Sequence, residues 1–98
     1  MQFLVIAKDG TDAEAPARRQ AVREQHLAGA RPHVEAGVII IGGAILDDDG
    51  RMIGSTLVYE VPDRATLDAI IDADPYVTGG VWHDIEIRPF RVAVRSKG

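Results

Sequence analysis

Short apolar runs alternate along the chain with longer, more polar stretches whose apolar residues recur at helical spacing. The apolar runs predict strands, and the polar stretches predict helices. The run over residues 2–8 is apolar almost throughout, which indicates a central strand buried on both faces. The predicted order is strand 2–8, helix 13–35, strand 38–46, strand 52–61, a helix that Asp63 caps and Pro75 closes, and strand 81–94.

Prolines and a glycine set the expected limits of the long helix. Pro16 is tolerated because it falls in the first turn, where a backbone N–H has no helical partner. Pro32 should kink or end the regular helix near Ala30, and Gly37 is expected to terminate it.

The predicted strands carry their own signals of irregularity. Gly42-Gly43 interrupts an apolar run and indicates a bulge or the close approach of another group. Asp47-Asp48-Asp49-Gly50 predicts a hairpin turn. Pro89 cannot donate a ladder hydrogen bond, so its strand should lie at a sheet edge or carry a bulge there. Ser96-Lys97-Gly98 is expected to form a frayed tail.

The order strand, helix, strand, strand, helix, strand is that of the split βαβ or ferredoxin-like α+β fold. We expect residues 1–98 to form a single domain. Two helices can cover only one face of the sheet, whereas strands 38–46 and 52–61 are apolar on both faces. A homodimer that packs sheet against sheet would bury the uncovered face, and we expect one.

Composition and charge narrow the function. The net charge of −4 argues against nucleic acid as a partner, because phosphate binding requires a basic surface. There is no cysteine, which excludes a disulfide or a thiolate metal site. Residues 1–8 lack a basic leader region, and no apolar run approaches the roughly 20 residues that span a bilayer. We expect a soluble cytoplasmic protein that does not bind membranes.

His26 and Asp74 are the candidates for acid and base chemistry. The ordinary pKa of histidine, about 6.5, suits proton transfer at neutral pH, and His26 lies near the apolar side of the long helix. The Asp74 carboxylate is expected at the C-terminal end of the second helix, where the helix dipole disfavours it unless a cation compensates. Packing is the alternative role of His26, and a simple helix stop is that of Asp74.

Four further side chains have two interpretations each. Ser55 either hydrogen-bonds locally or points into a cavity as a polar contact. Arg23 shares a helix side with His26, so it could hold a ligand carboxylate or pair with a carboxylate of the chain. Packing in the core or in the dimer is favoured over a place in a cavity wall for Tyr76 and Trp82. The carboxylates that could pair with Arg23 are Asp74 and Glu24.

No cofactor is indicated. His26, His33 and His83 do not show the spacing of metal ligands, so we expect no metal. Gly42-Gly43 lacks the following helix of a phosphate-binding loop, so we expect no nucleotide either.

Four short motifs recur together along this chain: Arg23-Glu24-Gln25-His26-Leu27, Gly54-Ser55, Asp74-Pro75-Tyr76-Val77 with Gly79-Gly80-Val81, and Ile87-Arg88-Pro89-Phe90. With these motifs the chain resembles the YciI-like (YCII-related) family from about residue 3 to residue 92. The departures are Gly80, which follows Gly79 where an alanine-glycine pair is usual, and Pro32-His33 within the helix; both bear on the local shape of the pocket.

The resemblance implies a ferredoxin-like dimeric α+β barrel with a His-Asp pair in a cleft. In this chain the pair is His26 and Asp74, with Ser55 and Arg23 as neighbours in the site. Separately from the resemblance, we include Tyr76 among the expected substrate-binding residues. A related branch of the family includes chloromuconolactone dehalogenase, a lyase that acts on a lactone. The expected substrate is therefore a small molecule.

Two functions follow from these observations. The first is an enzyme of the lyase or hydrolase type that acts on a small organic acid or lactone, with His26 as general base or acid and Asp74 orienting it. The second is a dimeric module that binds a ligand, or docks on a larger enzyme, without chemistry. The fold hosts both classes, and turnover of a bound ligand separates them.

Overall fold

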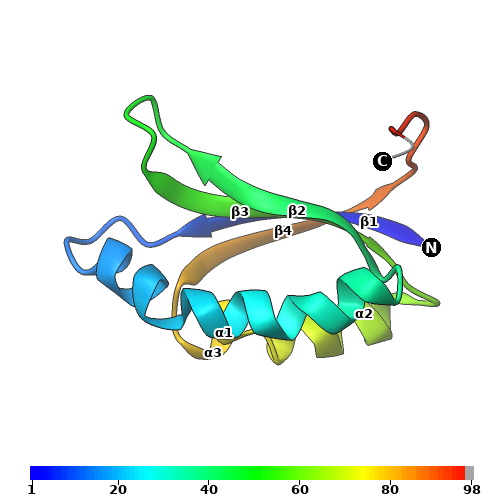
Figure 1. The fold of residues 1–98 in the computed structure, drawn as a ribbon, viewed down its shortest axis with the longest axis horizontal. Coiled ribbons are helices and arrows are strands. Elements are labelled where there is room, and N and C mark those ends of the chain that lie inside the picture. The colour runs from blue at the N-terminus through cyan, green and yellow to red at the C-terminus, as the bar shows by residue number, and fades with distance from the viewer. Residues whose placement is uncertain (97–98) are drawn as a thin grey trace.

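Four antiparallel strands form one sheet with all three helices on one of its faces (Figure 1), in a computed structural model that describes residues 1–96. The second half of the predicted tail, Lys97-Gly98, lies outside the described residues. The elements are β1 Gln2–Asp9, α1 Ala15–Glu35, β2 Ile39–Leu46, β3 Met52–Glu60, α2 Arg64–Asp72, α3 Pro75–Thr78 and β4 Trp82–Phe90.

The strand order β2-β3-β1-β4 is that of the ferredoxin-like α+β fold and confirms the predicted fold class. β1 is central, as its apolar sequence predicts, and pairs with β3 and β4 on its two sides. β4 lies at an edge, where Pro89 is tolerated opposite Phe3. β4 is shorter than the predicted strand 81–94 because it ends at Phe90.

The long helix does not end near Ala30, which was one of the two outcomes predicted for Pro32, because α1 continues through Pro32 to Glu35. The proline removes a single helical hydrogen bond, and the end of the helix is well satisfied. The Gly37 N–H donates to the carbonyl of Val34 at 3.1 Å, and the Val38 N–H donates to that of His33 at 2.8 Å. These bonds make a Schellman motif, in which Gly37 has φ +76° and terminates the helix as expected.

The glycine pair of β2 carries a close approach and no bulge. The β2–β3 ladder is irregular between Ile39 and Ile41 and between Ile45 and Leu46, outside the pair. A Cβ atom placed on Gly42 would lie 2.9 Å from the Cδ2 atom of Leu57. Of the two features that the sequence allowed at this point, the close approach is the one present.

A short helix that the sequence pattern did not predict begins directly after Asp74. α2 ends at Asp72, and Asp74 is the N-cap of α3 with an extended backbone (φ −67°, ψ 131°). The predicted position at the unfavourable C-terminal end of a helix is therefore wrong. The carboxylate accepts a hydrogen bond from the Tyr76 N–H at 2.9 Å and sits where a helix favours a negative charge.

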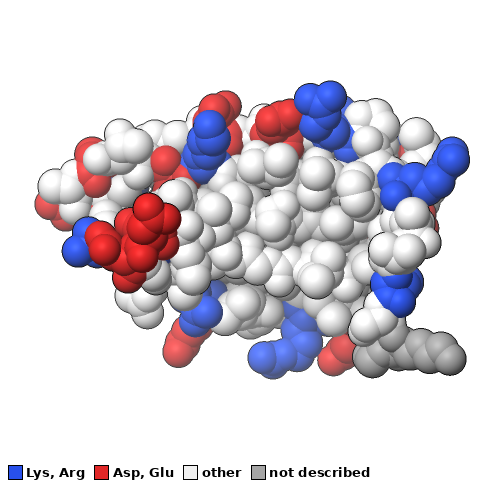
Figure 2. Space-filling model, turned by 90° about the horizontal axis from the view of Figure 1, so that it is seen from above, with Lys and Arg blue, Asp and Glu red and all other residues white. Residues whose placement is uncertain are grey.

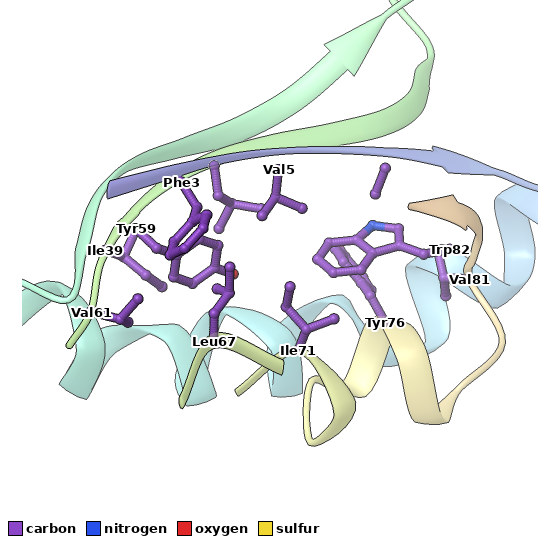
Figure 3. Close-up of a cluster of buried hydrophobic side chains, with 12 residues drawn as sticks. Phe3, Val5, Ile39, Tyr59, Val61, Leu67, Ile71, Tyr76, Val81 and Trp82 are labelled. Atoms are coloured by element: carbon purple, nitrogen blue, oxygen red, sulfur yellow. The ribbon is translucent and has the colours of Figure 1, made fainter. Parts of the chain in front are cut away.

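The core fills the space between the sheet and the helices, as Figure 3 shows. The side of β1 that faces the helices is buried, whereas Leu4 and Ile6 on the opposite side are half-buried. The sequence predicted that β1 is buried on both faces, and in the single chain only the face toward the helices is fully buried. The core residues are Phe3, Val5, Ala7, Ile39, Leu57, Tyr59, Val61, Leu67, Ile71, Tyr76, Val81 and Trp82.

The face of the sheet opposite the helices is uncovered. Seen from that side, the middle of the molecule is uncharged and the charged side chains lie around its rim (Figure 2). Ile41, at 66% exposure, and Phe90, at 42%, project from the two edge strands of the sheet. Across residues 1–96, none of the helices combines the length and the apolar character needed to cross a membrane.

Candidate active site

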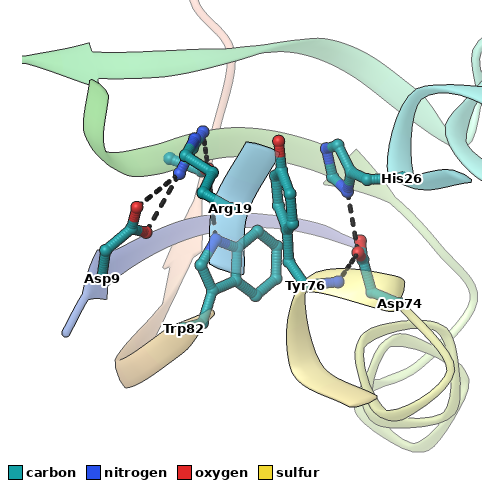
Figure 4. A network of polar contacts seen from close by, with 7 residues as sticks. Asp9, Arg19, His26, Asp74, Tyr76 and Trp82 are labelled. Carbon is teal, nitrogen blue, oxygen red and sulfur yellow. Dashed lines mark hydrogen bonds and ion pairs between the residues drawn. The ribbon is translucent and has the colours of Figure 1, made fainter. Parts of the chain in front are cut away.

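His26 and Asp74 meet although 48 positions separate them in the sequence. His26 projects from the middle of α1 toward α3, and its Nδ1 atom lies 2.7 Å from Oδ1 of Asp74. Both side chains are nearly buried, with 10% and 12% of their surfaces exposed. A carboxylate only accepts hydrogen bonds, so this contact places a hydrogen on Nδ1. The second ring nitrogen points away from Asp74 (Figure 4) and is free to exchange a proton.

Aromatic rings hold the imidazole in this orientation. The Tyr76 ring stacks on it with 3.8 Å between the ring centroids and an interplanar angle of 14°. Trp82 meets the imidazole edge-on at 5.9 Å and Tyr76 at 5.6 Å. Because Asp74 also accepts from the Tyr76 N–H, one short segment fixes both the carboxylate and the stacking ring. The histidine is therefore held by a hydrogen bond along one edge and by packing over one face.

A cavity of about 530 Å³ lies beside the imidazole, between α1 and the β2–β3 half of the sheet. It brings together four of the predicted site residues, whereas Asp74 stands behind His26 and does not line it. The polar part of the wall is cationic or neutral, and no Asp or Glu belongs to it. The polar side chains that line the cavity are Arg19, Arg23, His26, Arg31, Ser55 and Tyr76.

A second buried charge pair, which the sequence reasoning did not select, borders the same cavity. Nη1 of Arg19 lies 3.0 Å and 2.9 Å from the two carboxylate oxygens of Asp9, and Nη2 donates to Oγ of Ser55 at 3.0 Å. The indole N–H of Trp82 donates to the same Ser55 oxygen at 3.2 Å. The Arg19 guanidinium also lies over the Tyr76 ring, with Cζ 4.6 Å from its centroid. Figure 4 shows how this pair and the His-Asp pair flank Tyr76.

The structure resolves the alternatives left open for three side chains. Ser55 does both things expected of it, since it bonds to its neighbours and lines the cavity. Arg23 lines the cavity and pairs with neither candidate carboxylate; over residues 1–96 it makes no salt bridge. Tyr76 belongs both to the core and to the cavity wall.

Burial changes the chemistry of the two tyrosines. It raises the pKa of Tyr59, and the negative charge of Asp74 raises it further. Burial also raises the pKa of Tyr76, although Arg19 and Arg23 oppose that shift. Both phenols are therefore neutral at physiological pH, and Tyr76 can act on a ligand as a hydrogen-bond donor.

Arg19 and Asp9 left a signal in the sequence that periodicity could have revealed. Arg19 precedes Arg23 by four residues and His26 by seven, so the three lie on one side of the helix. Asp9 continues the alternation of Phe3, Val5 and Ala7 at the buried side of β1. A charged residue at a position that alternation marks as buried requires a partner of opposite charge.

Metal ligation receives no support from the described part of the chain, residues 1–96. It contains no group of three His, Asp or Glu side chains that could hold a metal ion. The chemistry that the site offers is proton transfer at His26, with hydrogen-bond donors and cations around it.

Sequence comparison places the chain among known proteins. The profile of the YCII-related domain matches residues 1–91. Protein YciI of Escherichia coli O6:H1 is 30% identical over 97 residues, which cover 93% of this chain and 97% of that protein. An uncharacterized protein of Haemophilus influenzae is 28% identical over the same shares of both chains.

Solved structures share the fold. A 5-chloro-2-hydroxyhydroquinone dehydrochlorinase from Burkholderia phenoliruptrix AC1100 has a TM-score of 0.82 at 24% identity, over 95% of this chain and 96% of that one. An antibiotic biosynthesis monooxygenase has a TM-score of 0.54 at 18% identity, over 94% and 99%. At these identities the likeness establishes the ferredoxin-like fold alone.

Proposed function

The chain belongs to the YCII-related domain family, and we propose that it is a small-molecule enzyme of the lyase or hydrolase type. Its substrate would be a small organic acid or lactone. The observation that carries the proposal is the 2.7 Å contact between His26 Nδ1 and Asp74 Oδ1 beside a cavity of about 530 Å³. A cavity of this size accommodates a small organic molecule.

His26 acts in this proposal as the general base and later as the acid. Its free nitrogen takes a proton from the substrate, and the Asp74 carboxylate stabilises the imidazolium that forms. Asp74 accepts a hydrogen bond from the Tyr76 N–H at the start of α3, where a helix favours a negative charge. Such a pair removes a proton next to a carbonyl, or activates water for attack on a lactone.

The rest of the wall suits the charge that develops on the substrate. Proton removal next to a carbonyl builds negative charge on its oxygen, which Ser55 and Tyr76 can stabilise by donating hydrogen bonds. Arg23 makes no salt bridge with any carboxylate of residues 1–96, so its guanidinium can hold a carboxylate of the substrate.

The fold is compatible with eliminations on small cyclic compounds. The similar structure from Burkholderia is a dehydrochlorinase in complex with 2,5-dihydroxybenzoquinone. The proposal for this chain depends on its own side chains, and that compound is a sensible first ligand to test.

We also propose that the functional unit is a homodimer. The sheet face opposite the helices carries apolar side chains from all four strands and is uncovered in the single chain (Figure 2). A second copy packed against this face would bury it and complete the dimeric α+β barrel. The apolar residues of this face are Leu4, Ile6, Ile41, Ile45, Val58 and Phe90.

A ligand screen followed by a turnover assay tests the catalytic proposal. Small carboxylic acids, lactones and phenolic compounds, with 2,5-dihydroxybenzoquinone among them, are screened by thermal shift. A ligand at 100 times its dissociation constant stabilises the folded protein by about 2.7 kcal/mol. Each ligand is then incubated with the protein and followed for chemical change. We expect His26→Ala to lower the rate of turnover by about 10²- to 10⁴-fold.

His83→Ala is the matched control, because His83 is exposed on β4 and lines no part of the cavity. It should leave both binding and turnover unchanged. A ligand that the protein converts equally well without His26 would contradict the proposed role of the histidine. A ligand that binds beside His26 but is never converted would favour the non-catalytic binding module.

A further inference from the structure

The Ser55 hydroxyl is surrounded by donors. Nη2 of Arg19 approaches its oxygen at 3.0 Å and Nε1 of Trp82 approaches it at 3.2 Å. Neither group can accept a hydrogen bond, because a guanidinium and an indole N–H only donate. Both contacts therefore use the Ser55 oxygen as the acceptor.

The count of hydrogen-bonding positions then fixes what Ser55 can still do. A serine hydroxyl has two acceptor lone pairs and one hydrogen. Arg19 and Trp82 occupy the two lone pairs, so only the hydrogen remains available. Within residues 1–96 no acceptor receives that hydrogen, and Ser55 is 3% exposed and lines the cavity. A buried hydroxyl hydrogen requires a partner, which the cavity can supply.

Both donors are rigidly held. Arg19 is 5% exposed, and Asp9 accepts from its Nη1 with both carboxylate oxygens, so the guanidinium cannot turn away from Ser55. Trp82 is 6% exposed and packs edge-on against Tyr76. The hydroxyl therefore cannot rotate to accept from a ligand unless one of these buried contacts breaks.

We propose that Ser55 is locked as a hydrogen-bond donor into the cavity, and that Arg19, Asp9 and Trp82 are the positioning residues that lock it. The ligand must then present an acceptor oxygen at this point, which a carbonyl, a carboxylate or a phenolate provides. A group that can only donate, such as an indole N–H, is rejected. The inference rests on the cavity of the proposed function and specifies its substrate class.

The remainder of the wall agrees with this specificity. Arg23 and Arg31 add positive charge, and no carboxylate of residues 1–96 lines the cavity. Asp9 and Asp74 contact Arg19 and His26 from behind, outside the cavity wall. A ligand with an acceptor oxygen at Ser55 and a negative group near Arg23 satisfies both ends of the site.

Three aromatic probes of similar size test the lock. Benzoate carries a charged acceptor, acetophenone a neutral acceptor, and indole an N–H that only donates. Dissociation constants are measured from backbone amide shifts in NMR titrations, and the single tryptophan adds an indole N–H signal that reports directly on Ser55. We expect both acceptors to bind the native protein and to move this signal, whereas free indole does not.

Two substitutions of Ser55 separate the hydroxyl from the side chain as a whole. Ser55→Ala removes the donor. Its affinity for acetophenone should therefore fall about fivefold, and its affinity for benzoate should fall at least about tenfold. Ser55→Thr keeps the hydroxyl and should retain native affinity for both. Weakening in Ser55→Ala that Ser55→Thr does not share is then assigned to the hydroxyl.

Trp82→Phe tests the locking directly. It frees one lone pair of Ser55 while it keeps an aromatic ring in place, so the hydroxyl can now accept. Indole should gain at least about fivefold in affinity relative to acetophenone. Two results would contradict the proposal that Ser55 can only donate. The first is an unchanged preference for acceptor probes in Trp82→Phe, and the second is acceptor binding to Ser55→Ala as tight as to the native protein. Neither result would contradict the proposed active site. Probes that move no amide near His26, Ser55 or Arg23 in the native protein would overturn the proposed function together with the lock.

Discussion

At the scale of single residues, the site is built from two buried basic side chains that share one helix. Arg19 and His26 lie seven residues apart on α1, and each contacts a carboxylate from another element. Both pairs are buried, with no side chain more than 12% exposed. A buried charge is tolerated when it is paired, and removing one partner costs about 3–5 kcal/mol. The two aspartates therefore hold Arg19 and His26 at fixed positions around the cavity.

The tyrosines provide a pH prediction at the same scale. The chain has two, Tyr59 and Tyr76, and burial raises the pKa of both. A raised pKa in the folded state means that the folded protein holds these protons more tightly than the unfolded chain does. The stabilisation is fully present below the unfolded pKa of about 10 and is lost as the pH rises through the folded values.

Absorbance of tyrosinate during an alkaline titration checks this expectation. The native protein should show little tyrosinate at pH ~10 and should ionise at higher pH together with loss of structure. In denaturant, both phenols should titrate near 10. Tyr59→Phe should make the protein less sensitive to alkaline pH. Two tyrosines that ionise near pH 10 in the folded protein would show that neither phenol is buried as described.

The residues of the site were partly predictable, and the reason differs from one residue to the next. His26, Ser55 and Arg23 were identified from short motifs, and the structure brings them to one cavity. Arg19 and Asp9 belong to no such motif, and each contacts a residue of a different element. Pairing between distant elements depends on packing, which periodicity in one segment does not specify.

At the scale of elements, α3 decides where the Asp74 carboxylate stands. Periodicity predicted the strands and the longer helices because each repeats its apolar spacing several times. Four residues of α3 are too few for such a repeat, so the sequence placed Asp74 at the end of α2 instead of at the start of a new helix. The motif that contains Asp74 was identified, but the helix end expected beside its carboxylate was wrong. That helix end belongs to α3, which only tertiary packing stabilises.

Two glycines test how α1 and α3 hold this geometry. Gly79 follows α3, and a Cβ atom there would lie 2.7 Å from the carbonyl oxygen of Pro75 and 3.2 Å from Cγ1 of Val22 on α1. We expect Gly79→Ala to lower stability by about 1–3 kcal/mol, since two packed elements must separate. Turnover should fall as well, because α3 carries Asp74. Thermal melts and the turnover assay measure the two effects.

Gly29→Ala is the matched control for this substitution. Gly29 lies within α1 with no atom within 4 Å of its would-be Cβ, and alanine favours the helix by about 0.5–1 kcal/mol. The midpoint of its thermal melt should therefore rise while that of Gly79→Ala falls. Equal changes in the two variants would show that the contact between α3 and α1 does not constrain the site.

At the scale of the whole molecule, one layer of helices leaves half of the sheet without cover. Figure 1 shows the helices on a single face, and the other face carries apolar residues on every strand. This asymmetry was predictable from the sequence, because β2 and β3 are apolar on both sides while only two long helices are available. Only a second molecule can cover the free face, and the sequence indicates such a partner through the exposed apolar residues of that face.

A charge on the open face tests the proposed dimer. Ile41 lies on the edge strand β2 and is 66% exposed in the single chain. If a second copy packs there, Ile41→Lys places two like charges near a symmetric apolar interface and should convert the dimer to a monomer. Val34→Lys is the control, because Val34 is 54% exposed on α1, on the opposite side of the molecule. Analytical ultracentrifugation should give the mass of two chains for the native protein and the control, and of one for Ile41→Lys. A native protein that sediments as a single chain would mean that the open face serves another partner, since an apolar sheet face of this extent is rarely left to solvent.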